Sequence, residues 1–169
     1  MPRVPFPDLP GHGRLWVFPL SRELTDAERG RCVEVVDRFL EQWAAHGHPL
    51  RSGRELREGR FFLVGVDVDA EAPSGCSIDA LTGHLRALGA ELGATFIDHS
   101  PVWYRDGEKV RTASRAEFRA LAEAGGVGPD TRVFDTSLTR VAQVRDGELE
   151  RPAAETWHGR VFFRSRRPA

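Results

Sequence analysis

Lysine is almost absent from this sequence, because Lys109 is its only lysine and arginine supplies the rest of the positive charge. Neither sign of charge is in excess: 24 Lys and Arg residues stand against 25 Asp and Glu residues, for a net charge of −1. A nearly neutral protein has no overall positive field to attract nucleic acid or anionic lipid. The composition therefore argues against nucleic acid as the partner.

Cysteines and long apolar runs are also scarce. Cys32 and Cys76 are the two cysteines, and they form neither a metal-ligand pair nor a disulfide framework. No stretch approaches the roughly 20 apolar residues that span a bilayer, and no apolar run at the N-terminus resembles a signal peptide. We expect a reduced, cytoplasmic protein with no metal and no cofactor, which does not span a membrane, although peripheral docking to a membrane complex stays open.

The first 13 residues are rich in proline and glycine, which predicts an extended arm that cannot be helical. Val4, Phe6 and Leu9 alternate with the prolines and give this arm apolar side chains with which to dock. A pre-extended segment loses little entropy on docking. These three residues are therefore candidates for binding a partner or the body of the protein.

Residues 14–99 have the pattern of strand, helix, two strands, helix and strand. The first helix opens with the capping box of Thr25 and Glu28, and the second opens at Ser77. This order predicts a ferredoxin-like layer, with two helices on one face of an antiparallel sheet. The strands are expected at 15–18, 50–56, 60–68 and 95–98, and the helices should end near 46–47 and 93. The first helix should pack against residues 61–66 through Val35, Val36, Phe39 and Trp43, with Cys32 also buried.

Residues 100–163 form a second pattern, and a basic tail follows at 164–169. A hairpin is expected around residues 106–107, then a short helix opened by Ser114 and Glu117, and then a strand at 132–134. A further hairpin turn is expected at 145–148. The sequence thus predicts an α+β fold made of two fused lobes.

The second lobe resembles the GYF-like modules of bacteria over residues 102–135. Trp103 and Tyr104 precede the hairpin turn, the helix follows, and residues 129–131 lead into the strand. The resemblance implies a hairpin–helix–strand fold and a protein-interaction role. The chain departs from it at residues 111–113, which stand where such modules usually carry Gly-Pro. Because successive strand residues face opposite sides, one of Trp103 and Tyr104 should be buried and the other is a candidate binding anchor.

Residues 16–158 also resemble an uncharacterised bacterial family often labelled "ABC transporter ATPase". The shared segments are residues 22–28, 42–47, 75–79, 105–107 and 157–158. An ATPase P-loop needs the pattern Gly-x4-Gly-Lys-Ser/Thr, in which backbone amides and the lysine hold phosphates. Lys109 has no such loop before it. We therefore reject the ATPase activity.

Residues 75–79 place a thiol, a hydroxyl and a carboxylate at the expected start of the second helix. In one interpretation this is capping chemistry: Ser77 is the N-cap, Asp79 complements the helix dipole, and Cys76 packs just before the cap. In another, the backbone amides of Ser74, Gly75 and Ser77 help to hold an anion.

A third interpretation makes Cys76 a catalytic thiolate at the helix N-terminus. Such a nucleophile needs a base within hydrogen-bond reach, and the candidates are His46, His48, His99 and His158.

The sequence favours a non-catalytic interaction or accessory subunit of a larger bacterial assembly, with a protein partner. The alternative is a cysteine-dependent hydrolase or transferase, in which Cys76 is the nucleophile and His158, His46 and Asp79 complete the catalytic site.

Overall fold

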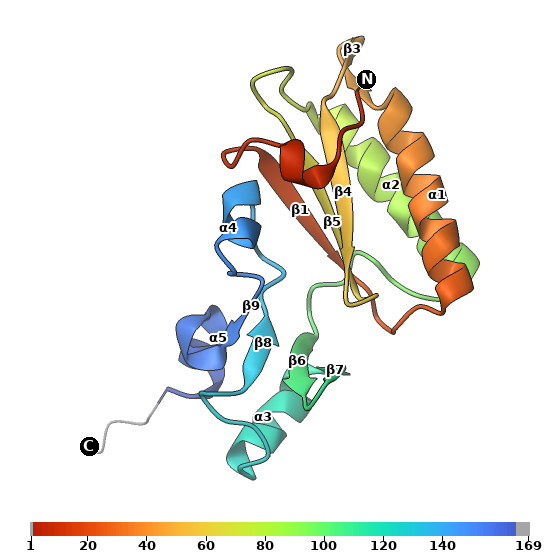
Figure 1. Ribbon diagram of the computed structural model, residues 1–169. Helices are drawn as coiled ribbons and strands as arrows, with labels where there is room; N and C mark the ends of the chain where they lie inside the picture. The colour runs from red at the N-terminus through yellow and green to blue at the C-terminus, as the bar shows by residue number, and fades with distance from the viewer. Residues whose placement is uncertain (1, 165–169) are drawn as a thin grey trace. The chain divides into compact units, whose positions relative to one another are not determined.

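The computed structural model describes residues 2–164 and divides the chain into two compact units. The first unit holds the chain up to Asp98 together with Ser137–Asp146, and the second holds His99–Thr136 and the chain from Gly147 onward. Both units combine helices with antiparallel strands, so the α+β prediction is confirmed (Figure 1). The lobe predicted over 100–163 is interrupted, because Ser137–Asp146 returns to the first unit. Apart from Arg164, the predicted basic tail lies outside the described residues.

The sheet of the first unit has three antiparallel strands in the order β1-β5-β4. These strands are β1 (Arg14–Pro19), β4 (Ser52–Arg57) and β5 (Phe61–Val66), and they match three of the four that were predicted. Helices α1 (Asp26–Gln42) and α2 (Gly75–Leu92) lie together on one face (Figure 1). α2 ends at Leu92, and its C-cap Gly93, where the helix was predicted to close, is left-handed with φ of 65°.

The fourth strand, predicted at residues 95–98, does not form. Thr95 instead exchanges hydrogen bonds with Ser21, whose hydroxyl accepts from the Thr95 amide at 3.0 Å. The edge of β1 that a fourth strand would cover is partly bonded by a later segment, because Leu15 donates its amide to the Thr139 carbonyl and Arg14 bridges to Arg140. Residues 95–98 therefore do not pair with β1, because Thr95 is bonded to Ser21 and part of the β1 edge is bonded to the later segment.

The helical core follows the predicted periodicity. Val36, Phe39 and Trp43 are buried in one cluster with the β5 side chains, whereas Val35 is half-buried at its border. The first helix nevertheless ends at Gln42 and not near residues 46–47, because Trp43 adopts an extended conformation. The chain then forms a small hairpin of β2 (Ala44–Ala45) and β3 (His48–Pro49), with positive φ angles at its two turn residues.

The N-terminal arm covers the other face of the sheet and belongs to the core of the first unit. Contrary to the prediction, part of it is helical: Phe6–Asp8 forms the 3-10 helix η1. Phe6 and Leu9 are buried, and a Cβ built on Gly65 of β5 would lie 2.7 Å from Leu9 Cδ1. Helix α4 (Val141–Arg145) packs beside the arm, since the same Cβ would lie 3.1 Å from Val141 Cγ2. Only glycine allows this close approach.

The second unit contains a four-stranded sheet in the order β7-β6-β8-β9. The predicted hairpin, helix and strand are all present as β6 (Val102–Asp106), β7 (Lys109–Ala113), α3 (Arg115–Glu123) and β8 (Arg132–Phe134). The unit is completed by β9 (Glu150–Pro152), the 3-10 helix η2 (Ala153–Glu155) and α5 (Trp157–Phe162).

The hairpin turn predicted at 145–148 is wrong. A turn does form at Asp146 and Gly147, with φ of 79° at Gly147, but it follows the short helix α4, on which Val141 and Val144 are buried, and it does not join two paired strands. Over the described residues, no helix is both long and apolar enough to cross a membrane.

Replacing Leu9 by alanine should destabilise the protein by about 2–5 kcal/mol, because it opens a cavity against the sheet. Leu9 is 2% exposed. Asp8→Ala is the matched control, since Asp8 is exposed on the same turn and should change stability by less than about 0.5 kcal/mol. Urea denaturation of both variants measures the difference. Equal stability of the two variants would show that the arm is not part of the core.

Candidate functional site

The start of α2 is built by two serines three residues apart. Ser74, and not Ser77, is the N-cap: the Ser77 amide donates to Ser74 Oγ at 3.1 Å, and the Ser74 amide donates to Ser77 Oγ at 2.8 Å. This is a capping box in which serine takes the place of the usual glutamate. The helix therefore begins at Gly75, two residues earlier than predicted, because the extended Ser74 can bond forward to Ser77.

This cap already uses the Ser74 and Ser77 amides, which are two of the groups that an anion would need. Both serine hydroxyls and the Ser77 amide are bonded within the box, and Ser77 Oγ also donates to the Ser74 carbonyl at 2.8 Å. Ser77 is buried, and its carbonyl accepts a hydrogen bond from Trp43 Nε1 at 2.8 Å. Residues 74–77 thus join α2 to the end of α1, and the capping interpretation accounts for their polar contacts.

Cys76 occupies the second position of α2 and is exposed, with Asp79 exposed one turn along the helix. Among the described residues of the first unit, no group forms a hydrogen bond with the Cys76 thiol. His46 lies in the same unit, exposed in the β2–β3 turn. His158 belongs to the second unit. The catalytic candidates are therefore divided between the two units.

His158 is part of the core of the second unit. It is 1% exposed, its Nδ1 lies 2.8 Å from Thr156 Oγ1, and its ring stacks on Trp157 with centroids 3.8 Å apart. Burial lowers the pKa of His158 to about 4, against a smaller raising effect of Asp135. The imidazole is consequently neutral near pH 7. Its contacts with Thr156 and Trp157 show that His158 packs in the core of the second unit.

The other candidate binding residues are covered to different degrees. Trp103 is 1% exposed, so it is the inward member of its pair. Tyr104 is half-buried, with its ring 5.4 Å from the ring of Phe118. Phe6 and Leu9 are buried in the first unit, and Val4 is half-buried with its amide bonded to the Ser52 carbonyl. None of these five side chains is an exposed anchor.

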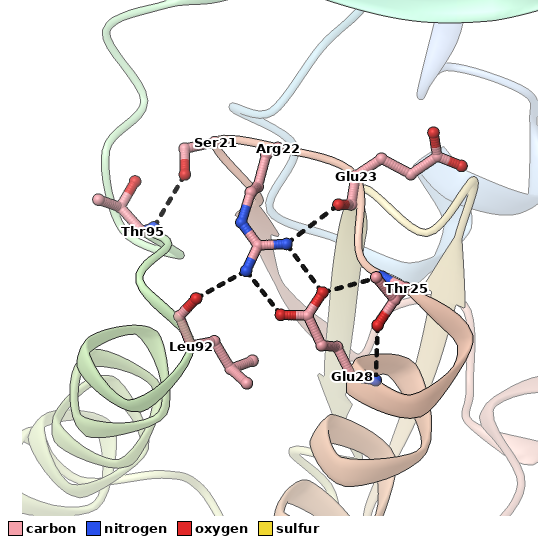
Figure 2. Close-up of polar contacts among 7 residues, drawn as sticks. All are labelled: Ser21, Arg22, Glu23, Thr25, Glu28, Leu92 and Thr95. Carbon is pink, nitrogen blue, oxygen red and sulfur yellow. Dashed lines mark hydrogen bonds and ion pairs between the residues drawn. The ribbon is translucent and has the colours of Figure 1, made fainter.

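A polar cluster that sequence reasoning missed joins the start of α1 to the end of α2 (Figure 2). Arg22 donates to both carboxylate oxygens of Glu28, at 2.8 and 2.6 Å, and to the carbonyl of Leu92 at 2.6 Å. Glu28 also closes the predicted capping box with Thr25. The hydrogen bond from Arg22 is the main reason why the pKa of Glu28 falls to about 2.

This cluster has a structural role. Leu92 ends α2, and the last carbonyls of a helix lack backbone partners and carry partial negative charge. The Arg22 guanidinium supplies both a hydrogen-bond donor and a positive charge there. The forked pairing with Glu28 holds it in place, so residues 22–28 fix the ends of two helices.

A second feature that sequence reasoning missed lies on α3 and α5 of the second unit. The guanidinium of Arg115 lies 5.0 Å from the ring centroid of Trp157, and that of Arg119 lies 5.2 Å from the centroid of Phe162. Val161 is 42% exposed, the highest value among the large apolar side chains described. We call the group of Arg115, Arg119, Trp157, Arg160 and Val161 the α3–α5 surface. Its sequence signal is faint: Arg115 and Arg119 are four residues apart, as are Trp157 and Val161.

An open hollow adjoins the α3–α5 surface at Arg160. Its volume is about 260 Å³, and its lining includes Pro129, Gly159, Phe163 and Arg164. Within the described residues, no group of three or more His, Cys, Asp or Glu side chains could hold a metal ion.

Comparison with protein-family models, curated proteins and solved structures finds no match to this chain.

Stability should fall as the pH is lowered from 7 to 5, because the unfolded chain protonates His158 near its ordinary pKa of about 6.5 while the folded protein resists until about 4. Above about pH 6.5 the imidazole is neutral in both the folded and the unfolded state, so His158 costs no stability there. By pH 5 its protonation in the unfolded chain lowers the free energy of unfolding by about 2 kcal/mol. Glu28 and Glu150 have lowered pKa values, so their contributions are lost only below about 4.5.

Urea denaturation at pH 7 and pH 5 measures this loss. His158→Gln should abolish most of the pH dependence, whereas His48→Gln should leave it unchanged, because His48 is exposed in the β2–β3 hairpin. An unchanged pH dependence in His158→Gln would refute the assignment.

Proposed function

We propose that the protein acts by binding, as an interaction or accessory subunit of a larger assembly, and that its second unit provides the binding surface. The α3–α5 surface is the observation that supports this proposal. Arginine and tryptophan are enriched where protein interfaces gain most of their energy, and an apolar centre with a polar rim is the common arrangement. Val161 and Trp157 provide such a centre, with arginines beside them.

We interpret the first unit as a ferredoxin-like layer without its fourth strand, and the second as a GYF-like hairpin–helix–strand lobe. The strand order β1-β5-β4 and the succession of β6, β7, α3 and β8 support these interpretations. The GYF-like interpretation favours a protein partner. The proposed membership of the bacterial family carries no ATPase activity with it, because the sequence has no P-loop.

A charge placed at the centre of the α3–α5 surface should disrupt partner binding. We expect affinity capture from the source cells to recover a partner with the wild-type protein and at least about fivefold less of it with Val161→Asp, since an unpaired carboxylate opposes the burial of an interface centre. Ala87→Asp is the matched control, because Ala87 is exposed on α2 of the first unit. Equal recovery with all three proteins would contradict the proposed surface.

The alternative is a thiol-dependent enzyme, and the exposure of Cys76 at the first turn of α2 is the observation that favours it. The two functions differ in the expected reactivity of this thiol. Cys32 is buried and its pKa is raised to about 11, mainly by burial, so labelling of the folded protein near neutral pH reports on Cys76.

If the protein acts by binding, iodoacetamide should modify Cys76 no faster than it modifies an unstructured peptide of residues 72–80. Cys76→Ser should also recover the same partner as the wild type. Mass spectrometry of the labelled protein over time measures the rate. A rate more than about tenfold above that of the peptide would favour the enzyme, since activated thiols react far faster than ordinary ones.

A further inference from the structure

We propose that the α3–α5 surface binds an acidic peptide segment of the partner, with carboxylates on its arginines and an apolar side chain over Val161. The inference rests on the proposed binding function and names the chemistry of the partner.

The arginines of this region differ from most others in having no acidic partner. Arg105 and Arg132, on the neighbouring sheet, both pair with Glu150. By contrast, among the described residues, no carboxylate pairs with Arg115, Arg119, Arg160 or Arg164. Arg115 donates its Nε to the Ser100 carbonyl at 3.1 Å. Their positive charge is therefore available to a partner.

Two of these guanidinium groups are held against aromatic rings. Arg115 over Trp157 and Arg119 over Phe162 form two contacts of the same kind between α3 and α5. A cation held over a ring face is attracted to it and loses freedom before any ligand arrives. A stacked guanidinium keeps its N–H edges available, and two N–H groups on one edge match the two oxygens of a carboxylate.

The apolar part of the surface consists of Trp157 and Val161. Trp157 and Val161 are four residues apart on α5, so they share one face of the helix, and Arg160 precedes Val161 directly. The adjoining hollow of about 260 Å³ lies slightly below the roughly 300–1,000 Å³ of small-molecule sites. It suits a single side chain of a peptide better than a cofactor.

The charges around the surface favour a short acidic peptide over nucleic acid. Glu117 and Glu123 lie on α3, and Glu155 lies just before α5. These carboxylates would repel the continuous phosphates of a nucleic acid, whose binding relies on many cationic contacts. A peptide needs only a few well-placed carboxylates and can place an apolar residue over Val161.

Fluorescence anisotropy with a labelled peptide tests the proposal. The probe is a short synthetic peptide of Glu and Asp with a Leu-Phe pair at its centre, and its counterpart carries Lys at every acidic position. We expect the acidic probe alone to bind, and Arg119→Glu and Arg160→Glu each to weaken it by about tenfold or more. Arg86→Glu is the matched control, because Arg86 is exposed on α2 without an acidic partner in the described residues, and it should change affinity by less than about twofold.

Arg160→Lys gives a second measurement that keeps the charge but removes the forked donor, and it should bind more weakly than the wild type. Unchanged melting temperatures would establish that the exposed substitutions preserve the fold. Failure of the acidic probe to bind, equal binding of the Lys probe, or tighter binding of a single-stranded oligonucleotide would each overturn the proposal. If the acidic probe fails while Val161→Asp still abolishes partner capture, only the partner's chemistry is wrong. If capture does not depend on Val161, the proposed function fails as well.

Discussion

Strand β5 is buried along its whole length, and the architecture of the first unit follows from the need to cover both of its faces. Helices α1 and α2 cover one face, and the N-terminal arm and α4 cover the other. A sheet covered on only one side would leave half of a strand such as Phe61–Val66 in water, at a cost of about 25 cal/mol for each Å² of apolar surface. This constraint explains why a segment as late as Ser137–Asp146 returns to the first unit.

Side-chain hydrogen bonds hold the ends of helices α1 and α2 in the first unit. Arg22 and Glu28 join the start of α1 to the end of α2, and Ser74 with Ser77 caps the start of α2. Both sets involve segments on which the resemblance to a bacterial family rests. A segment can therefore be distinctive in sequence because it fixes helix ends, without taking part in catalysis.

Local signals in the sequence predicted most of the secondary structure, while long-range contacts decided what it missed. Three predicted features depend on residues close in sequence, and all are present: the buried face of α1, the capping box of Thr25 and Glu28, and the hairpin at residues 106–107. The predicted fourth strand does not form, because Thr95 hydrogen-bonds to Ser21 and the edge of β1 hydrogen-bonds to Thr139. The cap of α2 was misplaced because two serines compete for one role, and backbone conformation decides between them. The α3–α5 surface was not predicted, because it brings together aromatic rings of α5 and arginines that lie about 40 residues before them in the sequence.

Most of the described arginines in both units pair with carboxylates, whereas those of the α3–α5 surface do not. In the first unit, Arg22, Arg31 and Arg54 each pair with a carboxylate distant in sequence or on another element, so their charge contributes to holding the unit together. On the α3–α5 surface, Arg119 lies over the ring of Phe162 and has no carboxylate partner among the described residues. A guanidinium that is immobilised but not neutralised contributes little to folding, because the attraction of an exposed cation for a ring is about 0.5–1 kcal/mol. Its value increases when a carboxylate arrives and water is displaced, since charge-assisted hydrogen bonds strengthen as the surroundings become less polar. This physical difference supports the proposal that a partner binds at the α3–α5 surface.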